Sequence, residues 1–102
     1  MFKLIILLTK KQAMGDDELR RYLLNVHAPL AKKMPGVRRY VMNIVQRPPN
    51  REPDYHAVAE LWFDDRESMK KAFSSPEGEI TQKDTEAFAA KMMTLFIDEH
   101  EI

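Results

Sequence analysis

Residues 2–9 read FKLIILLT, and this short stretch decides the fold class. Its aliphatic and β-branched residues predict a β-strand. Successive side chains of a strand point to opposite faces of a sheet, so both faces of this strand would be apolar. One face would hold Leu4, Ile6 and Leu8, and the other Ile5 and Leu7. Both faces of the sheet therefore need a cover that excludes water.

A helix predicted after this strand and a loop at 10–15 supplies the cover for one face. The acidic residues 16–18 follow Gly15 and suit the positive end of a helix dipole. Pro29 lies inside the helical pattern and predicts a kink, because proline has no amide hydrogen to donate to the carbonyl of Asn25. Pro35-Gly36 ends the helix. The apolar residues that recur at helical spacing are Leu19, Tyr22, Leu23, Val26, Leu30 and Met34.

The rest of the chain contains three further predicted strands and a second helical region. Strands are expected over residues 37–46, 54–63 and 92–98. Three prolines in the connecting residues 47–53 exclude a helix and a central strand there. Asp64 and Glu67 form the pattern of a capping box that begins one short helix, and Ser75-Pro76 begins another.

The resulting order, β-α-β-β-α-β, predicts one α+β domain over residues 1–102 with a ferredoxin-like sandwich. Right-handed crossovers would place both helical regions on the same face of a four-stranded antiparallel sheet. The other face would then expose a large apolar patch, which monomers rarely tolerate. We expect a second copy of the chain to cover it, giving a homodimer whose two sheets face each other and form an α+β barrel.

The composition narrows the classes of partner. Sixteen Lys and Arg residues balance sixteen Asp and Glu residues, whereas a nucleic-acid-binding protein normally carries a basic excess, so we expect no nucleic acid partner. The absence of cysteine excludes disulfides, thiol nucleophiles and thiolate metal sites. The longest aliphatic run, Leu4 to Leu8, is shorter than the roughly 7–15 residues of a signal-peptide core or the ~20 residues of a membrane span. We therefore expect a cytoplasmic protein that does not associate with membranes.

Asn25, His27 and Tyr40 are the first candidate site residues. The kink at Pro29 would tilt Asn25 and His27 out of the regular stripe, presenting a histidine to a cavity. The alternative is that Pro29 shapes packing and that His27 caps or lines the core. Tyr40 lies on the second predicted strand, where a tyrosine usually packs with its hydroxyl at the rim.

His56, Glu60 and Trp62 share one face of the third predicted strand and complete the set. Two ionisable groups and an indole among aliphatic residues indicate a polar barrel interior or a dimer seam. His56 and Glu60 would stand roughly 13 Å apart along a strand, so each needs its own partner. For Glu60, a solvated edge or interface is an alternative to a role at a site.

Four segments together resemble the EthD family: NVHAPLA at 25–31, PGVRRY at 35–40, AELWFD at 59–64 and SPEG at 75–78. The resemblance runs over almost the whole chain and implies the dimeric α+β barrel superfamily. Its relatives include methylmuconolactone isomerase, polyketide cyclases and cofactor-free monooxygenases. Isomerase-like members use a helix histidine, a strand tyrosine and a second strand histidine, and His27, Tyr40 and His56 fall at the matching places.

The resemblance implies an isomerase- or monooxygenase-like protein of catabolic or secondary metabolism that acts on a small carbonyl or aromatic compound. The expected chemistry is proton transfer at the carbon beside a carbonyl group, without a metal or other cofactor. Imidazole exchanges protons near neutral pH, so His27 is the expected base. Tyr40 and His56 would polarise or orient the carbonyl, while Asn25, Glu60 and Trp62 would contact the substrate. The alternative is a non-catalytic binding or accessory subunit for a partner oxidase.

Overall fold

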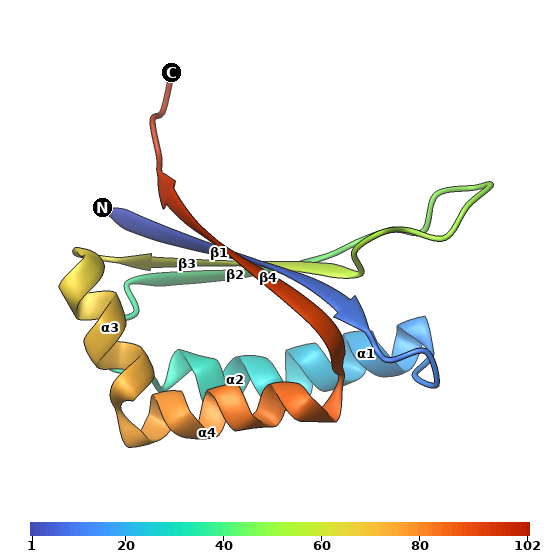
Figure 1. The fold of residues 1–102 in the computed structure, drawn as a ribbon, viewed down its shortest axis with the longest axis horizontal. Helices are drawn as coiled ribbons and strands as arrows, with labels where there is room; N and C mark the ends of the chain where they lie inside the picture. The colour runs from blue at the N-terminus through green and yellow to red at the C-terminus, as the bar shows by residue number, and fades with distance from the viewer.

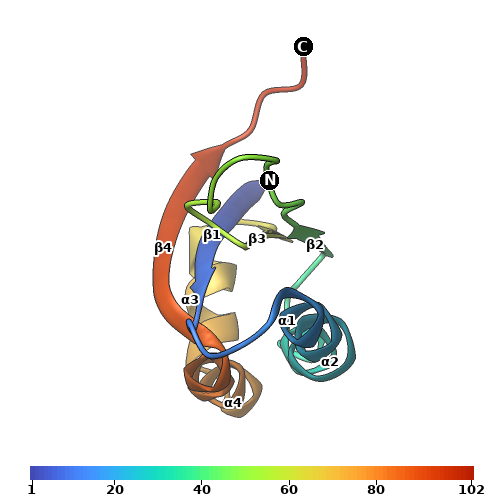
Figure 2. The ribbon, with the colours of Figure 1, turned by 90° about the vertical axis from the view of Figure 1, so that its right-hand side faces the viewer.

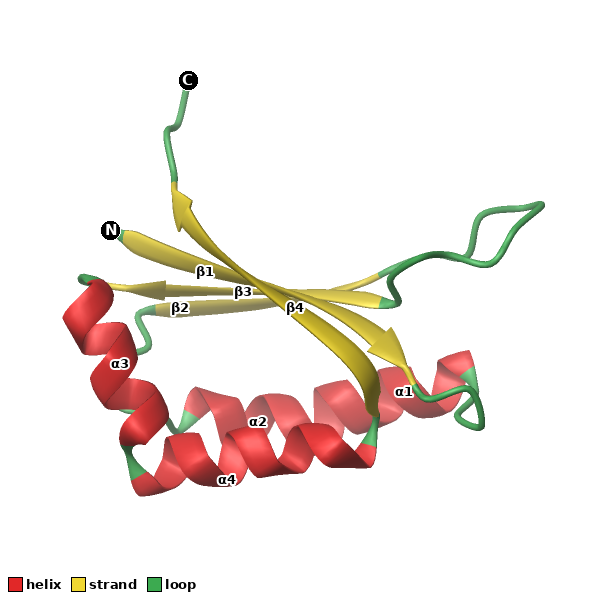
Figure 3. Ribbon diagram, viewed as in Figure 1, coloured by secondary structure: helices red, strands yellow, loops and turns green.

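The computed structural model describes residues 1–102, and four strands form one antiparallel sheet (Figure 3). Their order is β2-β3-β1-β4, which Figure 2 shows from right to left. The central strand β1 pairs with β3 on one side and with β4 on the other. This arrangement confirms the ferredoxin-like α+β fold. The strand bounds are β1 Phe2–Lys10, β2 Arg39–Ile44, β3 Ala57–Phe63 and β4 Ala89–Asp98.

All the helices lie on one side of the sheet, and the C-terminal tail rises from the other side (Figures 1 and 2). No helix combines the length and the apolar character needed to cross a bilayer. The helical segments are α1 Asp16–Tyr22, the π-helical η1 Leu23–His27, α2 Ala28–Lys32, α3 Arg66–Ser74, α4 Pro76–Asp84 and the 3-10 turn η2 Thr85–Ala87.

The main error in the predicted boundaries concerns the start of α3. The residue that caps α3 is Asp65, whose side chain accepts a hydrogen bond of 2.7 Å from the Ser68 amide. Asp64, the predicted cap, is instead paired with Arg38 at 2.8 Å. The predicted capping box is therefore wrong, whereas Ser75 does cap α4 by accepting from the Gly78 amide. Strands β2 and β3 are shorter than predicted, and β4 is longer because it begins at Ala89 rather than near residue 92.

The irregularity expected at Pro29 takes the form of a π-turn. The Ala28 amide donates to the carbonyl of Leu23, five residues back, so η1 holds one residue more than an α-helix would. Proline then falls at the start of α2, where no amide donor is needed. The extra residue moves His27 into the buried stripe and leaves Val26, the predicted stripe member, 42% exposed. The stripe that results is Leu19, Leu23, His27 and Ala31.

The two faces of the sheet differ in burial. The face toward the helices carries Leu4, Leu61 and Phe63, which are at most 2% exposed and pack against buried residues of the helices. The face away from the helices, here called the open face, leaves Met93 42% and Leu95 38% exposed. The apolar residues of β1 thus have a helical cover on one side only.

Candidate functional site

An apolar cavity of about 40 Å³ lies between the helices and the sheet. Of its 16 lining residues, only His27, Tyr40, Thr81 and Thr85 carry a side-chain nitrogen or oxygen. The Thr81 hydroxyl donates to the Glu77 carbonyl at 2.8 Å, and the Thr85 hydroxyl donates to the Gln82 carbonyl at 2.6 Å. The remaining two polar side chains of the lining, His27 and Tyr40, each keep one polar atom without a hydrogen-bond partner in the chain.

The π-turn places the His27 ring against the fully buried Phe88, edge to face, with the ring centroids 4.7 Å apart. Its Nδ1 lies 2.9 Å from Oδ2 of Asp84, while Nε2 has no hydrogen-bond partner in the chain. No fully buried side-chain nitrogen or oxygen lacks a partner, so Nε2 retains accessible surface. Nε2 is the ring nitrogen left to meet a ligand.

Asp84, at the end of α4, is a residue of this site that sequence reasoning missed. Its other carboxylate oxygen, Oδ1, accepts a hydrogen bond of 2.6 Å from the Tyr22 hydroxyl. This bond raises the pKa of Tyr22 above its ordinary value, which keeps the phenol protonated. Asp84 stands 57 residues from His27 and 62 from Tyr22 in the sequence, so no local pattern indicated the contact.

Tyr40 belongs to β2 and lies opposite Leu61 of β3, so its side chain shares the helix-covered face. Burial raises the pKa of Tyr40 to about 12. The hydroxyl therefore stays protonated at neutral pH and can donate a hydrogen bond. No partner for it exists in the chain, and like Nε2 of His27 it is not fully enclosed.

Tyr40 and Met42 also line a second, open groove of about 520 Å³ beside α2 and the edge strand β2. These two side chains therefore border both the groove and the inner cavity. The cavity itself is lined by Met34, Met42 and Met92, whose flexible side chains can change rotamer to enlarge it.

Glu60 and Trp62 do not face this cavity. In the register of β2 and β3, Trp62 lies opposite Arg39 and Glu60 opposite Val41, which puts both on the open face. Tyr40 and Trp62, both expected to contact one substrate, therefore lie on opposite faces of the sheet, and that expectation is wrong. The alternation within each strand was predicted correctly, but the pairing between strands brings Tyr40 onto the face of Leu61 rather than that of Trp62.

On the open face, Glu60 and Trp62 belong to a group of side chains joined by ion pairs, hydrogen bonds and a cation–π contact. This group is here called the open-face cluster: Lys3, Arg39, Asn43, Glu60, Trp62 and Glu99. The Lys3 ammonium lies 2.8 Å from Glu60 and 3.0 Å from Glu99. The Trp62 indole donates to Glu99 at 2.9 Å. Hydrogen bonds from Lys3 and Asn43 hold the pKa of Glu60 below its usual value.

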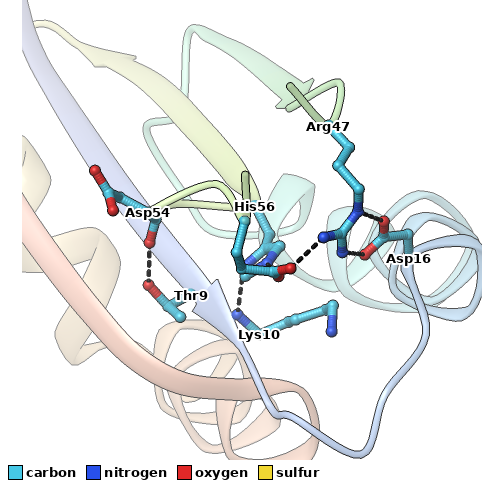
Figure 4. Close-up of polar contacts among 7 residues, drawn as sticks. Thr9, Lys10, Asp16, Arg47, Asp54 and His56 are labelled. Atoms are coloured by element: carbon cyan, nitrogen blue, oxygen red, sulfur yellow. Dashed lines mark hydrogen bonds and ion pairs between the residues drawn. The ribbon is translucent and has the colours of Figure 1, made fainter. Parts of the chain in front are cut away.

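His56 lies just before β3, at the end of the sheet, where it anchors the proline-rich loop (Figure 4). Its Nδ1 accepts a hydrogen bond of 3.1 Å from the Lys10 amide, and its Nε2 lies 3.1 Å from Glu52. Arg47 connects Glu52 to Asp16. His56 does not line the cavity, and Asn25 is exposed and does not line it either. The chain has no cluster of three residues that could hold a metal ion.

Comparison with known proteins gives a family match and two similar sequences. The EthD domain family matches residues 11–92. An uncharacterized 11.0 kDa protein of the thcB-thcC intergenic region of Rhodococcus erythropolis is 32% identical over 77 residues, which cover 74% of this chain and 75% of that protein. The crystal structure of an EthD family protein from Bacillus halodurans is 30% identical, covers 98% of this chain and 99% of that one, and has a TM-score of 0.84.

Two more distant structures share the fold alone. A dimeric protein of unknown function with a ferredoxin-like fold from Bacteroides fragilis has a TM-score of 0.72 at 13% identity, over 96% of this chain and 95% of that one. SnoaB, a cofactor-independent oxygenase from Streptomyces nogalater, has a TM-score of 0.69 at 14% identity, over 99% of this chain and 94% of that one.

Proposed function

This chain belongs to the EthD family, and from that membership and the geometry of its cavity we propose that it performs cofactor-free acid–base chemistry on a small, neutral carbonyl or aromatic compound. The observation that carries the proposal is that His27 and Tyr40 are the two polar side chains with uncommitted atoms in an otherwise apolar cavity. A charged ligand group would lose its hydration there without gaining a paired charge, so the substrate class is neutral.

In the proposed reaction, Nε2 of His27 removes a proton from the carbon next to a carbonyl. The Tyr40 hydroxyl donates a hydrogen bond to the carbonyl oxygen and stabilises the enolate that forms. Return of the proton from His27 to another carbon of the conjugated system gives an isomer. The same enolate is the species that would react directly with dioxygen, and the fold is shared with a cofactor-independent oxygenase.

Substrate entry requires the cavity to enlarge. About 40 Å³ exceeds the roughly 10–15 Å³ that a single water requires and is far below the roughly 150 Å³ of an apolar cavity that holds benzene. We propose that Met34, Met42 and Met92 repack as the ligand passes from the groove beside β2.

We also propose a homodimer whose sheets pack open face to open face. Met93 and Leu95 would gain cover. Within the open-face cluster, Lys3, Glu60 and Glu99 pair with one another in the same chain, and Arg39 stacks on Trp62, which lowers the cost of enclosing these groups. A related fold is described as dimeric. This arrangement would leave the cavity of each chain, on the other side of the sheet, open to its own groove.

The test uses β-tetralone, a neutral ketone with an exchangeable proton beside its carbonyl, and follows deuterium exchange from D₂O by NMR. If the natural substrate differs, a thermal-shift screen of neutral ketones and unsaturated lactones selects the probe. His27→Gln should lower the exchange rate on the order of 10²–10⁴-fold, the usual contribution of a general base.

His56→Gln is the matched control, because His27 and His56 are both 8% exposed and only His27 lines the cavity. The control should exchange at the wild-type rate. Exchange by His27→Gln at the wild-type rate would remove His27 as the base. Saturable binding of probes with no exchange above the uncatalysed rate would show a carrier rather than an enzyme.

A further inference from the structure

Asp84 and Tyr22 form a chain of hydrogen bonds that leads away from the cavity. The Tyr22 hydroxyl donates to one oxygen of Asp84 at 2.6 Å, and Nδ1 of His27 lies 2.9 Å from the other oxygen. Tyr22 comes from α1, His27 from η1 and Asp84 from the end of α4, so three segments meet here. Phe88 packs on both rings, 5.6 Å from Tyr22 and 4.7 Å from His27 between centroids.

This geometry determines where the imidazole proton lies. A carboxylate only accepts hydrogen bonds, so the nitrogen that faces it must carry a hydrogen. A neutral His27 with its proton on Nδ1 has a bare lone pair on Nε2, the atom without a partner in the chain. A base needs that lone pair on the nitrogen that meets the ligand.

We propose that Asp84, itself held by Tyr22, is the positioning residue that fixes His27 in the Nδ1–H tautomer and presents the Nε2 lone pair to the cavity. The Asp84 side chain is 16% exposed and the His27 side chain 10%, so water competes only weakly for this bond. The role of the tautomer in turnover rests on the proposed function, whereas the tautomer itself does not.

The same chain contains the opposite arrangement at His56. The Lys10 amide donates to Nδ1 of His56, so that nitrogen must be bare, and the proton of the neutral ring lies on Nε2 facing Glu52. The two buried histidines should therefore carry their protons on different nitrogens, which makes His56 an internal reference for His27.

The experiment is a long-range ¹H–¹⁵N NMR spectrum of the histidine rings in ¹⁵N-labelled protein at pH 8. We expect His27 to be protonated on Nδ1 and His56 on Nε2. Asp84→Asn should give His27 a measurable fraction of the Nε2–H tautomer, because the amide NH₂ can turn and donate to Nδ1, and should leave His56 unchanged.

Tyr22→Phe keeps the carboxylate but removes its second anchor, and should shift the His27 tautomer less than Asp84→Asn does. If Asp84→Asn does not fold, the wild-type spectrum and Tyr22→Phe still decide the matter. A wild-type His27 that is protonated on Nε2 at pH 8, or doubly protonated, would overturn the proposal. So would a folded Asp84→Asn variant with an unchanged His27 tautomer.

On a probe that exchanges, Asp84→Asn should lower kcat with little change in KM, because the residue does not touch the ligand. A comparable substitution in a Ser-His-Asp triad lowers kcat by about 10⁴ through the wrong tautomer. The two experiments decide separate proposals. Loss of exchange in His27→Gln tests whether His27 is the base, and the ¹⁵N spectrum tests whether Asp84 fixes the His27 tautomer.

Discussion

On the helix-covered face of the sheet, the few polar side chains around the cavity include two that each keep an atom without a partner. On the open face, the polar side chains of the open-face cluster contact one another. His27 and Tyr40 belong to the first group. Lys3, Glu60 and Trp62 belong to the second. Both faces are formed by alternate residues of the same strands, so the difference arises from what packs above each face.

The comparison separates two uses of polar groups in one small fold. An apolar site with unpaired donors and acceptors is suited to bind a ligand and exchange a proton with it. A face with exposed aliphatic residues and internally paired charges is suited to be buried by another protein surface. We therefore expect substitutions on the open face to affect assembly and substitutions on the other face to affect stability or turnover.

The largest expected effect is the loss of the dimer in Leu95→Asp. Two-fold symmetry would bury two unpaired carboxylates, and an uncompensated buried charge costs about 3–5 kcal/mol, or roughly 10²–10³-fold or more in Kd. Sedimentation equilibrium should show a dimer for the wild type and a monomer for the variant. Ile80→Asp, which alters a 55% exposed residue of α4, should leave the dimer intact. Equal association of Leu95→Asp and the wild type would mean that the open face is not the interface.

The core under the helices should give the next largest effect. Leu61→Ala should lower the free energy of unfolding by about 2–5 kcal/mol, because it leaves a cavity beneath the helices. That decrease should be the same at low and high protein concentration. The decrease caused by Leu95→Ala should grow with concentration, since it weakens a contact between copies. Urea unfolding at two protein concentrations measures both, and a concentration-independent effect of Leu95→Ala would contradict the distinction.

A smaller effect concerns pH and the open-face cluster. Hydrogen bonds from Lys3 and Asn43 hold the pKa of Glu60 below its usual value in the folded protein. The ionised Glu60 therefore contributes fully to the free energy of unfolding at pH values above its pKa in the unfolded chain, near 4.5. That contribution is lost as the pH falls through the lower, folded pKa. Glu60→Gln should therefore lower the free energy of unfolding at pH 7 and reduce its drop below pH ~5. Glu79→Gln, which removes an exposed carboxylate without a side-chain partner, serves as the control in the urea titrations. An identical acid dependence in Glu60→Gln and the wild type would refute the pairing.

The smallest effect is spectroscopic and tests the burial of Tyr40. Burial raises the pKa of this phenol to about 12. In a rapid alkaline pH jump followed by ultraviolet absorbance, Tyr40→Phe should remove the phenolate signal near pH 12. Tyr55→Phe, which alters a tyrosine outside the cavity, should retain that signal. If Tyr40→Phe instead removed a phenol that ionises at the ordinary pKa of about 10, the Tyr40 hydroxyl would be exposed to solvent in the wild type.

The strand and helix patterns predicted the architecture because each is a local property of the sequence. The apolar run of β1, the proline-rich loop and the Ser75 cap all appear where they were expected. The cap of α3 is Asp65 rather than Asp64, whose side chain pairs with Arg38, a residue distant in the sequence. A local pattern carries no information about such a partner.

The site was only partly predictable for the same reason. His27 and Tyr40 were identified and lie on one cavity, but the register of β2 against β3 decides which strand faces coincide. That register placed Trp62 on the other side of the sheet. Asp84 became visible only through a tertiary contact, since the end of α4 has no feature that marks it.

The π-turn of η1 has a consequence for comparing sequences. Eight residues separate Leu19 from His27, whereas in a regular α-helix seven residues are close to two full turns of 3.6. A relative that lacks one residue between these positions would form an uninterrupted α-helix and still hold its histidine over the cavity. An alignment across this segment therefore needs a one-residue gap to match side chains that occupy the same place. A gap-free alignment would pair His27 with a neighbour on the outer surface and would count the histidine as absent where it is present.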